Sequence, residues 1–441
     1  MAKLVRTLTL WDLTVLVVCA VIGSGVFLVP GVVLKQVDGS LILAMLVWIF
    51  GGLLSLLGGL AYGELSAFRP EAGGLYIYIR DCFGPLAAFL MGWTTFFVIG
   101  TGSAATLAVA FPAYLGQIIP LDPLMAKIIS IATIVVLTII NVRGVRQSAD
   151  LQNWTTIIKV AAIILMSVVL LWLGKGYQNL SGPDLWPAHF TASHLSAFGL
   201  AMISVLWAYE GWQYATFNAA EVVNPQRNFP RAFFIGLIAL ISLYLLANFS
   251  YIAALGVKGA TGIDAIASIS ISAVVGTKAA KLLSLAILIS IFSAENSVVL
   301  TTPRVFYAMA EDRLFFRKLA EVHPKFHTPA FAIISMGIWS SVLALTGTYQ
   351  QLLTYVIFAG WIFYGLGGAC VFIYRKKNPG LKLPYSTPGY PVTPILFVLA
   401  SAALVINTIA ADTRSAMVGI GIVLTGVPAY LIWRRGSQVR Q

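Results

Sequence analysis

Two glycines and a serine interrupt the first apolar stretch of the chain, in a place where a regular helix would need better helix formers. A helix break there would free backbone N–H groups and carbonyls able to hold a polar solute. We expect the amides of Ser24, Gly25 and Val26 to form the N-terminus of a half-helix, which suits a carboxylate. The carbonyls of Val21 and Ile22 would face an ammonium group. The alternative is close helix packing through small residues.

A second interruption, in a later apolar stretch, contains a carboxylate. Glu210 and Gly211 separate two helical segments, and an acidic side chain at membrane depth is costly unless it faces the protein interior. We expect Glu210 to attract a substrate ammonium or to take part in proton coupling. Its alternative role is structural, as a cap on the free amides of a half-helix that begins at Gly211. The Trp207 ring could line the site or act as its gate; the alternative is ordinary aromatic packing.

One lysine also lies within an apolar stretch. Lys159 could reach the membrane surface along its flexible stem. The other possibility is that its ammonium lies behind the first break, against carbonyls there. Ser293, Asn296 and Ser297 share one face of a later helix and could supply further polar groups. Lys159 would then act either as a fixed substitute for a metal ion or as a proton carrier.

Composition places these residues in a membrane protein. The chain has 441 residues, of which 59% are hydrophobic and 10% charged, and its mean hydropathy is +0.89. Soluble domains carry about 25% charged residues, so we predict an all-α polytopic membrane protein in contact with the lipid bilayer. The net charge of +12 does not indicate nucleic acid binding, because the basic residues gather in short loops on one side. The three cysteines lie in or beside apolar stretches and imply no disulfide framework.

About twelve apolar stretches are long enough to cross a bilayer. They lie near residues 12–35, 40–68, 83–112, 124–141, 153–174, 195–222, 231–256, 278–302, 329–347, 351–374, 392–411 and 415–433. With an even number, both termini share a side. The loops on that side hold 20 Lys and Arg against 7 on the other, which predicts cytoplasmic termini and a cell (plasma or inner) membrane location.

The two breaks indicate an internal repeat within a single transporter domain, 1–441. They lie 186 residues apart with four spans between them, which is typical of inverted-repeat secondary transporters. The repeats would cover about 10–175 and 195–376, and two extra helices about 392–435. Of the connections, 71–80 is expected to be a short interfacial segment, and 311–327 an amphipathic helix on the membrane surface.

Three motifs carry a family resemblance. They are Gly23-Ser24-Gly25-Val26-Phe27 with Pro30; Trp207-Ala208-Tyr209-Glu210-Gly211-Trp212 leading to Glu221-Val222-Val223-Asn224-Pro225-Gln226-Arg227-Asn228-Phe229-Pro230; and Arg304-Val305-Phe306-Tyr307-Ala308-Met309-Ala310-Glu311-Asp312 followed by His323-Pro324-Lys325. With them the chain resembles the amino acid–polyamine–organocation superfamily of transporters, and within it a bacterial-type member of the L-amino acid transporter branch. The resemblance covers nearly the whole chain.

The resemblance implies a LeuT-like five-plus-five inverted repeat with discontinuous helices 1 and 6, two extra C-terminal helices, and transport of amino acids by alternating access. The implied ligands of the substrate carboxylate are the amides of Ser24, Gly25 and Val26. Those of its amino group are the carbonyls of Val21, Ile22, Trp207 and Glu210. Trp207 matches an aromatic gate, and the pocket-lining positions are matched by Ile99, Ser103 and Trp361. Lys159 matches a lysine that occupies the place of a sodium ion.

Two departures from the family pattern limit what can be carried over. Some members have glycine at the position of Glu210, so side-chain selectivity does not transfer from them. Animal members joined to a glycoprotein subunit use a cysteine in the loop between spans three and four. The loop 114–124 has none, so no disulfide-linked glycoprotein partner is expected.

The sequence therefore predicts a sodium-independent amino acid transporter, working as an exchanger of neutral L-amino acids. Proton-coupled symport, carriage of cationic amino acids or polyamines, and a non-transporting sensor are the alternatives. No enzyme is predicted, because all four histidines lie in loops or at span ends and no nucleophile–base pair or metal cluster is visible. No cofactor and no metal are predicted.

Overall fold

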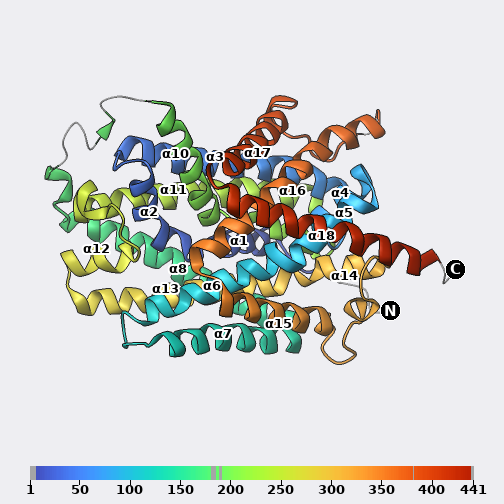
Figure 1. Cartoon of the computed structure of the whole chain (residues 1–441), viewed down its shortest axis with the longest axis horizontal. Helices are drawn as coiled ribbons and strands as arrows, with labels where there is room; N and C mark the ends of the chain where they lie inside the picture. The colour runs from blue at the N-terminus through green and yellow to red at the C-terminus, as the bar shows by residue number, and fades with distance from the viewer. Residues whose placement is uncertain (1–5, 180–184, 188–190, 381, 439–441) are drawn as a thin grey trace.

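Helices make up nearly all of the chain in this computed structural model, which describes residues 6–179, 185–187, 191–380 and 382–438 (Figure 1). The first two helices are α1 (Leu10–Val21) and α2 (Gly25–Gln36). The longer helices that follow are α3 (Leu41–Phe68), α6 (Gly100–Leu115), α7 (Pro123–Arg143), α8 (Val145–Leu173), α10 (Ala192–Ala208), α11 (Pro225–Ala260), α13 (Thr277–Thr301), α15 (Ala330–Thr346), α16 (Tyr349–Lys377), α17 (Val392–Ala411) and α18 (Thr413–Gln438). The shorter ones are α4 (Leu75–Phe83), α5 (Pro85–Thr94), α12 (Ile266–Val274), α14 (Pro303–Glu311), the π-helix η1 (Thr95–Ile99), and the 3₁₀ helices η2 (Gly176–Asn179), η3 (Trp212–Glu221) and η4 (Arg317–Ala320).

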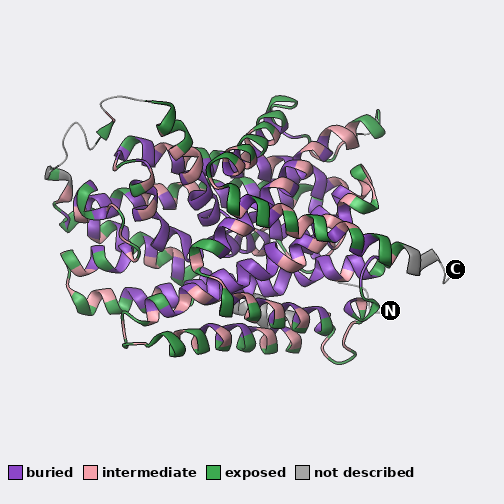
Figure 2. Ribbon diagram, in the orientation of Figure 1, coloured by how far each residue is buried: buried purple, intermediate pink, exposed green. Residues whose placement is uncertain are grey.

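The apolar helices account for the twelve predicted spans. Within the described residues, ten helical segments are long and apolar enough to cross a membrane, and α1 with α2 forms an eleventh crossing that is bent by 46°. The twelfth predicted span is α15, which is apolar but has only 17 residues. Large apolar side chains cover the outer surface, and the buried residues lie at the centre of the bundle (Figure 2). The prediction of an all-α polytopic membrane protein is confirmed.

The first helix lies in the middle of the bundle. α1 packs against α8, α11, α13 and η3, while α7 and α15 pack against each other at one edge (Figure 1). α17 and α18 lie outside α16. A helix enclosed on all sides by other helices can end in the middle of a membrane, because protein rather than lipid meets its free backbone groups.

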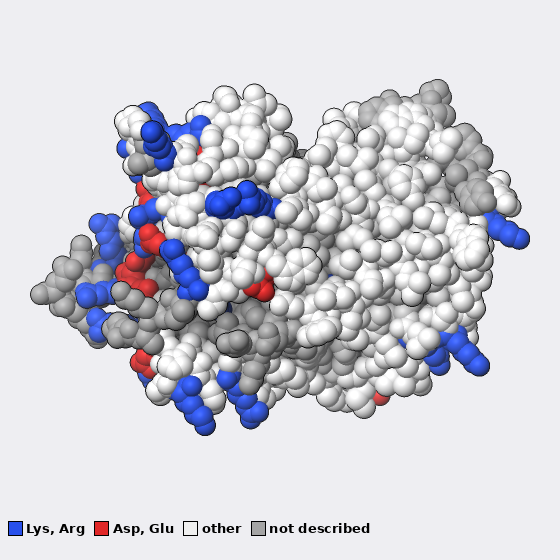
Figure 3. Space-filling view, turned by 180° about the vertical axis from the view of Figure 1, so that it is seen from behind, with Lys and Arg blue, Asp and Glu red and all other residues white. Residues whose placement is uncertain are grey.

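Charged residues gather at one end of the bundle. Figure 3 shows Lys, Arg, Asp and Glu together at this end and few at the other. We call it the basic end, and it contains the connections 69–81 and 311–325 and the end of α16. Arg80 in the first connection binds Asp312 in the second, and Lys377 at the end of α16 binds the Asp81 carbonyl. The opposite end, where α2 ends and α16 begins, is called the far end.

Two connections at the basic end differ from expectation. Residues 75–83 form the short helix α4, but its side chains Tyr76 and Tyr78 are fully buried rather than interfacial. The amphipathic helix predicted over 311–327 is wrong. α14 ends at Glu311, Arg313 takes a positive φ of 58°, and only the short 3₁₀ helix η4 follows. Leu314, Phe315 and Leu319 are buried, and Phe315 packs against Trp93 and Trp433. Phe316 is exposed.

A buried ion pair fixes the end of η3. The Arg304 Nε lies 2.9 Å from Glu221 Oε1, and both residues are less than a tenth exposed. The Glu221 carbonyl also accepts the amides of Thr7 and Leu8, at 2.8 and 2.9 Å. The start of the chain, η3 and α14 are therefore held together by Glu221.

We expect Glu221→Gln to destabilise the protein, because it leaves the Arg304 charge buried without a counter-charge. Breaking a buried pair in this way costs about 3 kcal/mol. The measurement is the thermal unfolding temperature of the purified protein in detergent, which should fall by several degrees. Glu321→Gln is the matched control, because Glu321 is exposed. Equal unfolding temperatures for the two variants would contradict this assignment.

Candidate binding site between two helix breaks

The first break leaves one helix start without hydrogen-bond partners. α1 ends at Val21, and α2 begins at Gly25 with Ser24 as its N-cap. In the described part of the chain, the amides of Ser24, Gly25 and Val26 form no hydrogen bond. The first turn of any helix has unpaired N–H groups and a positive dipole end. Here that end lies inside the protein, where it can receive an anion.

The second break is a change of helix type rather than a sharp bend. α10 ends at Ala208, Gly211 takes a φ of +118°, and the chain continues as the 3₁₀ helix η3 from Trp212. Residues Ala192–Glu221 form one candidate span, and among the described helix pairs that could make up a single span only α1 with α2 is bent by more than 40°. The sequence predicted a half-helix starting at Gly211; the structure has a 3₁₀ helix that starts one residue later.

The two breaks lie against each other. A Cβ on Gly25 would be 2.5 Å from the Ala208 Cα, and a Cβ on Gly211 would be 2.6 Å from the Ala20 carbonyl oxygen. The Tyr244 hydroxyl on α11 lies between them, 3.1 Å from the Val21 carbonyl and 2.9 Å from the Ala208 carbonyl. Only glycine permits these approaches, so the small residues serve both the break and its packing.

A small cavity of about 20 Å³ lies at the breaks. Its lining residues are Ala20, Val21, Gly23, Ser24, Gly25, Ser103, Leu107, Trp207, Glu210, Tyr214 and Val298. Space of this size holds about one water molecule, so a larger solute needs the walls to move. Six of the ten residues predicted for the site line this cavity: Val21, Ser24, Gly25, Ser103, Trp207 and Glu210.

The other four predicted residues, Ile22, Val26, Ile99 and Trp361, do not line this cavity. The Ile22 carbonyl already accepts Lys159 Nζ and Ser290 Oγ, at 2.7 and 3.1 Å, and two donors use both of its lone pairs. Val26 follows in the first turn of α2. The Ile99 carbonyl accepts the Ser103 hydroxyl at 2.7 Å. Trp361 on α16 is buried and packs against Tyr364 and against Phe397 on α17.

Glu210 is buried with neutral hydrogen-bond donors. Its Oε1 accepts the Tyr364 hydroxyl at 2.7 Å and the Gln213 side-chain amide. The Gly211 amide donates to Gln213 Oε1 at 3.3 Å, so Gln213 rather than Glu210 caps this helix start. No ion pair to Glu210 is formed within the described residues. A carboxylate that lines a cavity without a cationic partner can receive a cationic group from a ligand.

Tyr214 and Tyr364 are site residues that sequence reasoning missed. Tyr214 lines the cavity and its hydroxyl lies 3.0 Å from Ser103 Oγ. Its position, one helical turn after Glu210 in the sequence, could have indicated a site residue. Tyr364 lies 154 residues from Glu210 in the chain, and nothing in the sequence links the two.

The Lys159 ammonium lies behind the first break. Lys159 is completely buried, which excludes the alternative that its side chain extends to the membrane surface. Its Nζ donates to the carbonyls of Cys19 (3.0 Å), Ile22 (2.7 Å) and Ser290 (3.4 Å). The carbonyls of Cys19 and Ile22 are among those that the end of α1 would otherwise leave unpaired, and the Ser290 carbonyl belongs to α13. The ammonium holds them as a bound cation would.

The predicted partners of Lys159 on α13 lie about one to two turns beyond Ser290, the residue that contacts it. Ser293 Oγ is 3.0 Å from the Cys19 thiol, and Ser297 accepts from the Gln152 side chain at 2.5 Å. Asn296 accepts from Asn141 on α7 at 2.8 Å. The three residues therefore join α13 to α1, α8 and α7, and Ser290 is the α13 residue beside the ammonium. The part that these residues, with Lys159, are predicted to play in coupling transport stays a prediction.

A second buried acid on α13 was also missed. Glu295 is fully buried, and its Oε1 lies 3.4 Å from the Thr133 hydroxyl on α7. Its Oε2 has no hydrogen-bond partner in the described part of the chain. The sequence could have indicated it in the same way as Glu210, because each is an acidic residue within an apolar stretch. Glu295 contacts α7 and does not line the cavity.

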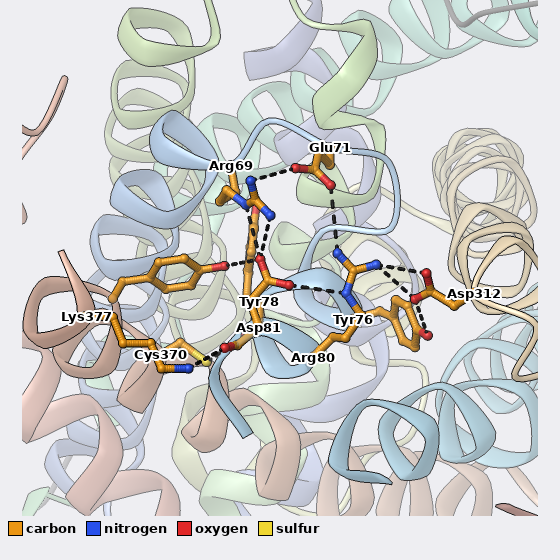
Figure 4. Close-up of polar contacts among 10 residues, drawn as sticks. Arg69, Glu71, Tyr76, Tyr78, Arg80, Asp81, Asp312, Cys370 and Lys377 are labelled. Atoms are coloured by element: carbon orange, nitrogen blue, oxygen red, sulfur yellow. Dashed lines mark hydrogen bonds and ion pairs between the residues drawn. The ribbon is translucent and has the colours of Figure 1, made fainter. Parts of the chain in front are cut away.

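A group of ion pairs closes the basic end. Arg69 Nη2 lies 2.9 Å from Asp81, Arg80 Nη1 lies 2.9 Å from Asp312, and Glu71 is within 4.0 Å of both arginines (Figure 4). We call these five residues the basic-end cluster. Burial raises the pKa of Asp81, but hydrogen bonds from Tyr374 and Arg69 and the charge of Arg80 outweigh it and hold that pKa below its usual value. The cluster joins the end of α3, α4 and the end of α14 in one layer.

Comparison with known proteins assigns the family. A family model described as amino acid permease matches residues 8–429. The chain belongs to the amino acid permease family. It is 34% identical to the serine/threonine exchanger SteT of Bacillus subtilis (strain 168), over 94% of each chain. It is 31% identical to the human cystine/glutamate transporter, over 98% of this chain and 86% of that one. It is 29% identical to the mouse large neutral amino acids transporter small subunit 2, over 95% and 79%.

These relatives agree with the family resemblance seen in the motifs. All three are named as transporters or exchangers of amino acids, so the comparisons point to transport rather than to enzymatic chemistry. In the part of the permease that the structure describes, no group of three or more His, Cys, Asp or Glu is placed to hold a metal ion.

Gly25→Ala tests the contact between the breaks. The new methyl would lie 2.5 Å from the Ala208 backbone, so α2 and α10 must separate. Overpacking of this kind costs about 1–3 kcal/mol. The unfolding temperature in detergent should fall for Gly25→Ala and stay unchanged for Gly421→Ala, where nothing lies within 4 Å of the new methyl. A Gly25→Ala protein as stable as wild type would show that the breaks do not touch.

Proposed function

We propose that this permease is a sodium-independent exchanger of neutral L-amino acids that works by alternating access. The observation that carries the proposal is the helix start at Ser24, Gly25 and Val26, whose amides are unpaired inside the protein beside a cavity. A buried row of free N–H groups is a site for a carboxylate, which every amino acid has. The three named relatives support amino acids as the substrate class.

The substrate ammonium is proposed to lie on the other side of the cavity. Ile22 was one of four predicted carbonyl ligands, but its carbonyl is fully used by Lys159 and Ser290. The Val21 carbonyl likewise accepts the Gly23 amide at 2.9 Å and the Tyr244 hydroxyl at 3.1 Å. We therefore assign the ammonium to the Glu210 carboxylate, which lines the cavity, with the carbonyls of Trp207 and Glu210 as the remaining predicted ligands. The two ends of one amino acid would then touch both helix breaks at once.

Sodium independence follows from the position of Lys159. Its ammonium supplies a permanent positive charge to the carbonyls at the end of α1. A sodium ion would need these same oxygens. We propose that the lysine takes the place of the ion, so that substrate binding needs no sodium. Proton carriage by Lys159 is the alternative.

We propose that the basic end faces the cytoplasm of a cell membrane, with both chain termini on that side. The excess of Lys and Arg in its loops supports this orientation. The repeats about 10–175 and 195–376, followed by the extra helices about 392–435, are proposed as the two halves that move against each other. The loop 114–124 contains no cysteine, which supports activity without a disulfide-linked glycoprotein partner.

Transport in proteoliposomes tests the proposal. We expect labelled L-serine or L-leucine to enter vesicles loaded with unlabelled amino acid and not to enter empty ones. Replacing sodium by choline should leave the exchange rate unchanged, because Lys159 supplies the charge. Uptake into empty vesicles driven by an acid exterior would identify a proton symporter instead. No uptake under any of these conditions would leave a sensor as the explanation.

Carriage of cationic amino acids is a second candidate, favoured by one observation. The Glu210 carboxylate lines the cavity without an ionic partner among the described residues. If it meets a cationic side chain, Glu210→Gln should weaken transport of L-arginine by roughly 30-fold or more, as losing one member of a buried charge pair does. Transport of L-serine by the same variant is the internal control. A parallel loss for both amino acids would assign Glu210 to the shared ammonium group.

A further inference from the structure

A tyrosine on α16 joins the two helix breaks at the far end. The Tyr349 hydroxyl lies 2.8 Å from the Trp207 indole Nε1 and 3.1 Å from Ser24 Oγ. The rings of Tyr349 and Trp207 meet edge to face, with their centres 6.3 Å apart. Trp207 and Ser24 both line the cavity, and Tyr349 lies just outside it.

The donors present fix the direction of one of these two hydrogen bonds. An indole nitrogen can only donate, so the Tyr349 oxygen accepts from Trp207. In the Tyr349–Ser24 contact either hydroxyl can donate; when Tyr349 donates, the Ser24 proton is free to point to another acceptor. Ser24 stands at the helix start whose amides are free, so its hydroxyl can donate to a carboxylate bound there. A chain of hydrogen bonds would run from Trp207 through Tyr349 and Ser24 to the substrate, and each bond strengthens the next.

At the far end Tyr349 contacts two residues of the cavity wall, and several groups of polar contacts lie toward the basic end. Tyr349 is in the first turn of α16, after the exposed cap Thr348, and is itself partly exposed. Toward the basic end lie the Glu210–Gln213–Tyr364 contacts, then the Arg304–Glu221 pair, then the basic-end cluster. Opening the far end would break the Tyr349 hydrogen bonds, while the ion pairs toward the basic end can stay formed.

We propose that the Tyr349 hydroxyl keeps the far end closed by holding Trp207 over the bound amino acid. We call this hydrogen-bonded contact the latch, and Trp207 the outer gate. The latch forms when the far end closes and is absent when it is open. Because Ser24 links the latch to the substrate carboxylate, a bound amino acid strengthens the closure. Tyr349 is thus a positioning residue that acts through Trp207 and Ser24. The inference rests on the proposed exchange function and on the far end being extracellular.

Loss of the latch has a kinetic signature that simple damage lacks. Without the hydroxyl, the loaded carrier favours its outward-facing form, and a substrate captured from outside is released again more often before the carrier turns. The half-saturation concentration (KM) on the outside therefore rises, and that on the inside falls. A smaller amount of folded protein lowers the maximal rate and leaves both KM values unchanged.

The test compares wild type, Tyr349→Phe and Tyr114→Phe in right-side-out and inside-out membrane vesicles. The vesicles are preloaded with unlabelled amino acid, and labelled L-serine and L-leucine are the probes. We expect the ratio of external to internal KM to rise roughly threefold to tenfold for Tyr349→Phe, as the loss of one or two hydrogen bonds allows. Tyr114 is the matched control, because its buried hydroxyl donates to the Phe27 carbonyl on α2 at 2.7 Å, and its variant should keep the wild-type ratio.

A second variant protects the test against misfolding. Trp207→Phe keeps an aromatic ring and loses the indole donor, so it should raise the same ratio, and the double variant should raise it no further. A wild-type ratio in Tyr349→Phe, with or without a lower maximal rate, would overturn the latch while leaving the exchange function standing. Wild-type vesicles that fail to exchange either probe would overturn the proposed function itself.

Discussion

Backbone groups released inside a membrane must find partners, and this requirement organises the structure around the first break. The carbonyls at the end of α1 are paired by Lys159, Ser290 and Tyr244, which come from three different helices. The amides at the start of α2 are not paired in the described part of the chain. The protein therefore satisfies one side of the break permanently and leaves the other side for a ligand. This asymmetry makes the break a binding site for an anion rather than a general flaw in a helix.

Close packing and binding are not alternatives at this site. Gly25 approaches the Ala208 backbone so closely that a methyl group would clash, and Gly211 approaches Ala20 in the same way. The small residues thus bring the two breaks together, and the cavity lies where they meet. A larger residue at Gly25 would disturb the site by moving α2 away from α10, a cause different from crowding of the bound carboxylate.

The sequence predicted the features that depend on local composition and on membrane depth. It located both breaks, placed Lys159 behind the first and Glu210 at the second, and gave the spans nearly as the structure has them. It missed features that depend on contacts between distant helices, such as Tyr364 on Glu210 and Tyr349 on Trp207 and Ser24. For Ile99 and Trp361, contact with the substrate stays a prediction, since neither side chain lines the small cavity at the breaks. The segment after Glu311 looked amphipathic, but Arg313 ends the helix there.

The central claim is that the free amides of α2 hold the carboxylate of an amino acid. The most direct measurement is an experimental structure of the permease with a bound amino acid. The account predicts carboxylate oxygens within about 3.2 Å of the amide nitrogens of Ser24, Gly25 and Val26, with the ammonium beside Glu210. A carboxylate bound elsewhere, with these amides paired inside a continuous helix, would contradict it.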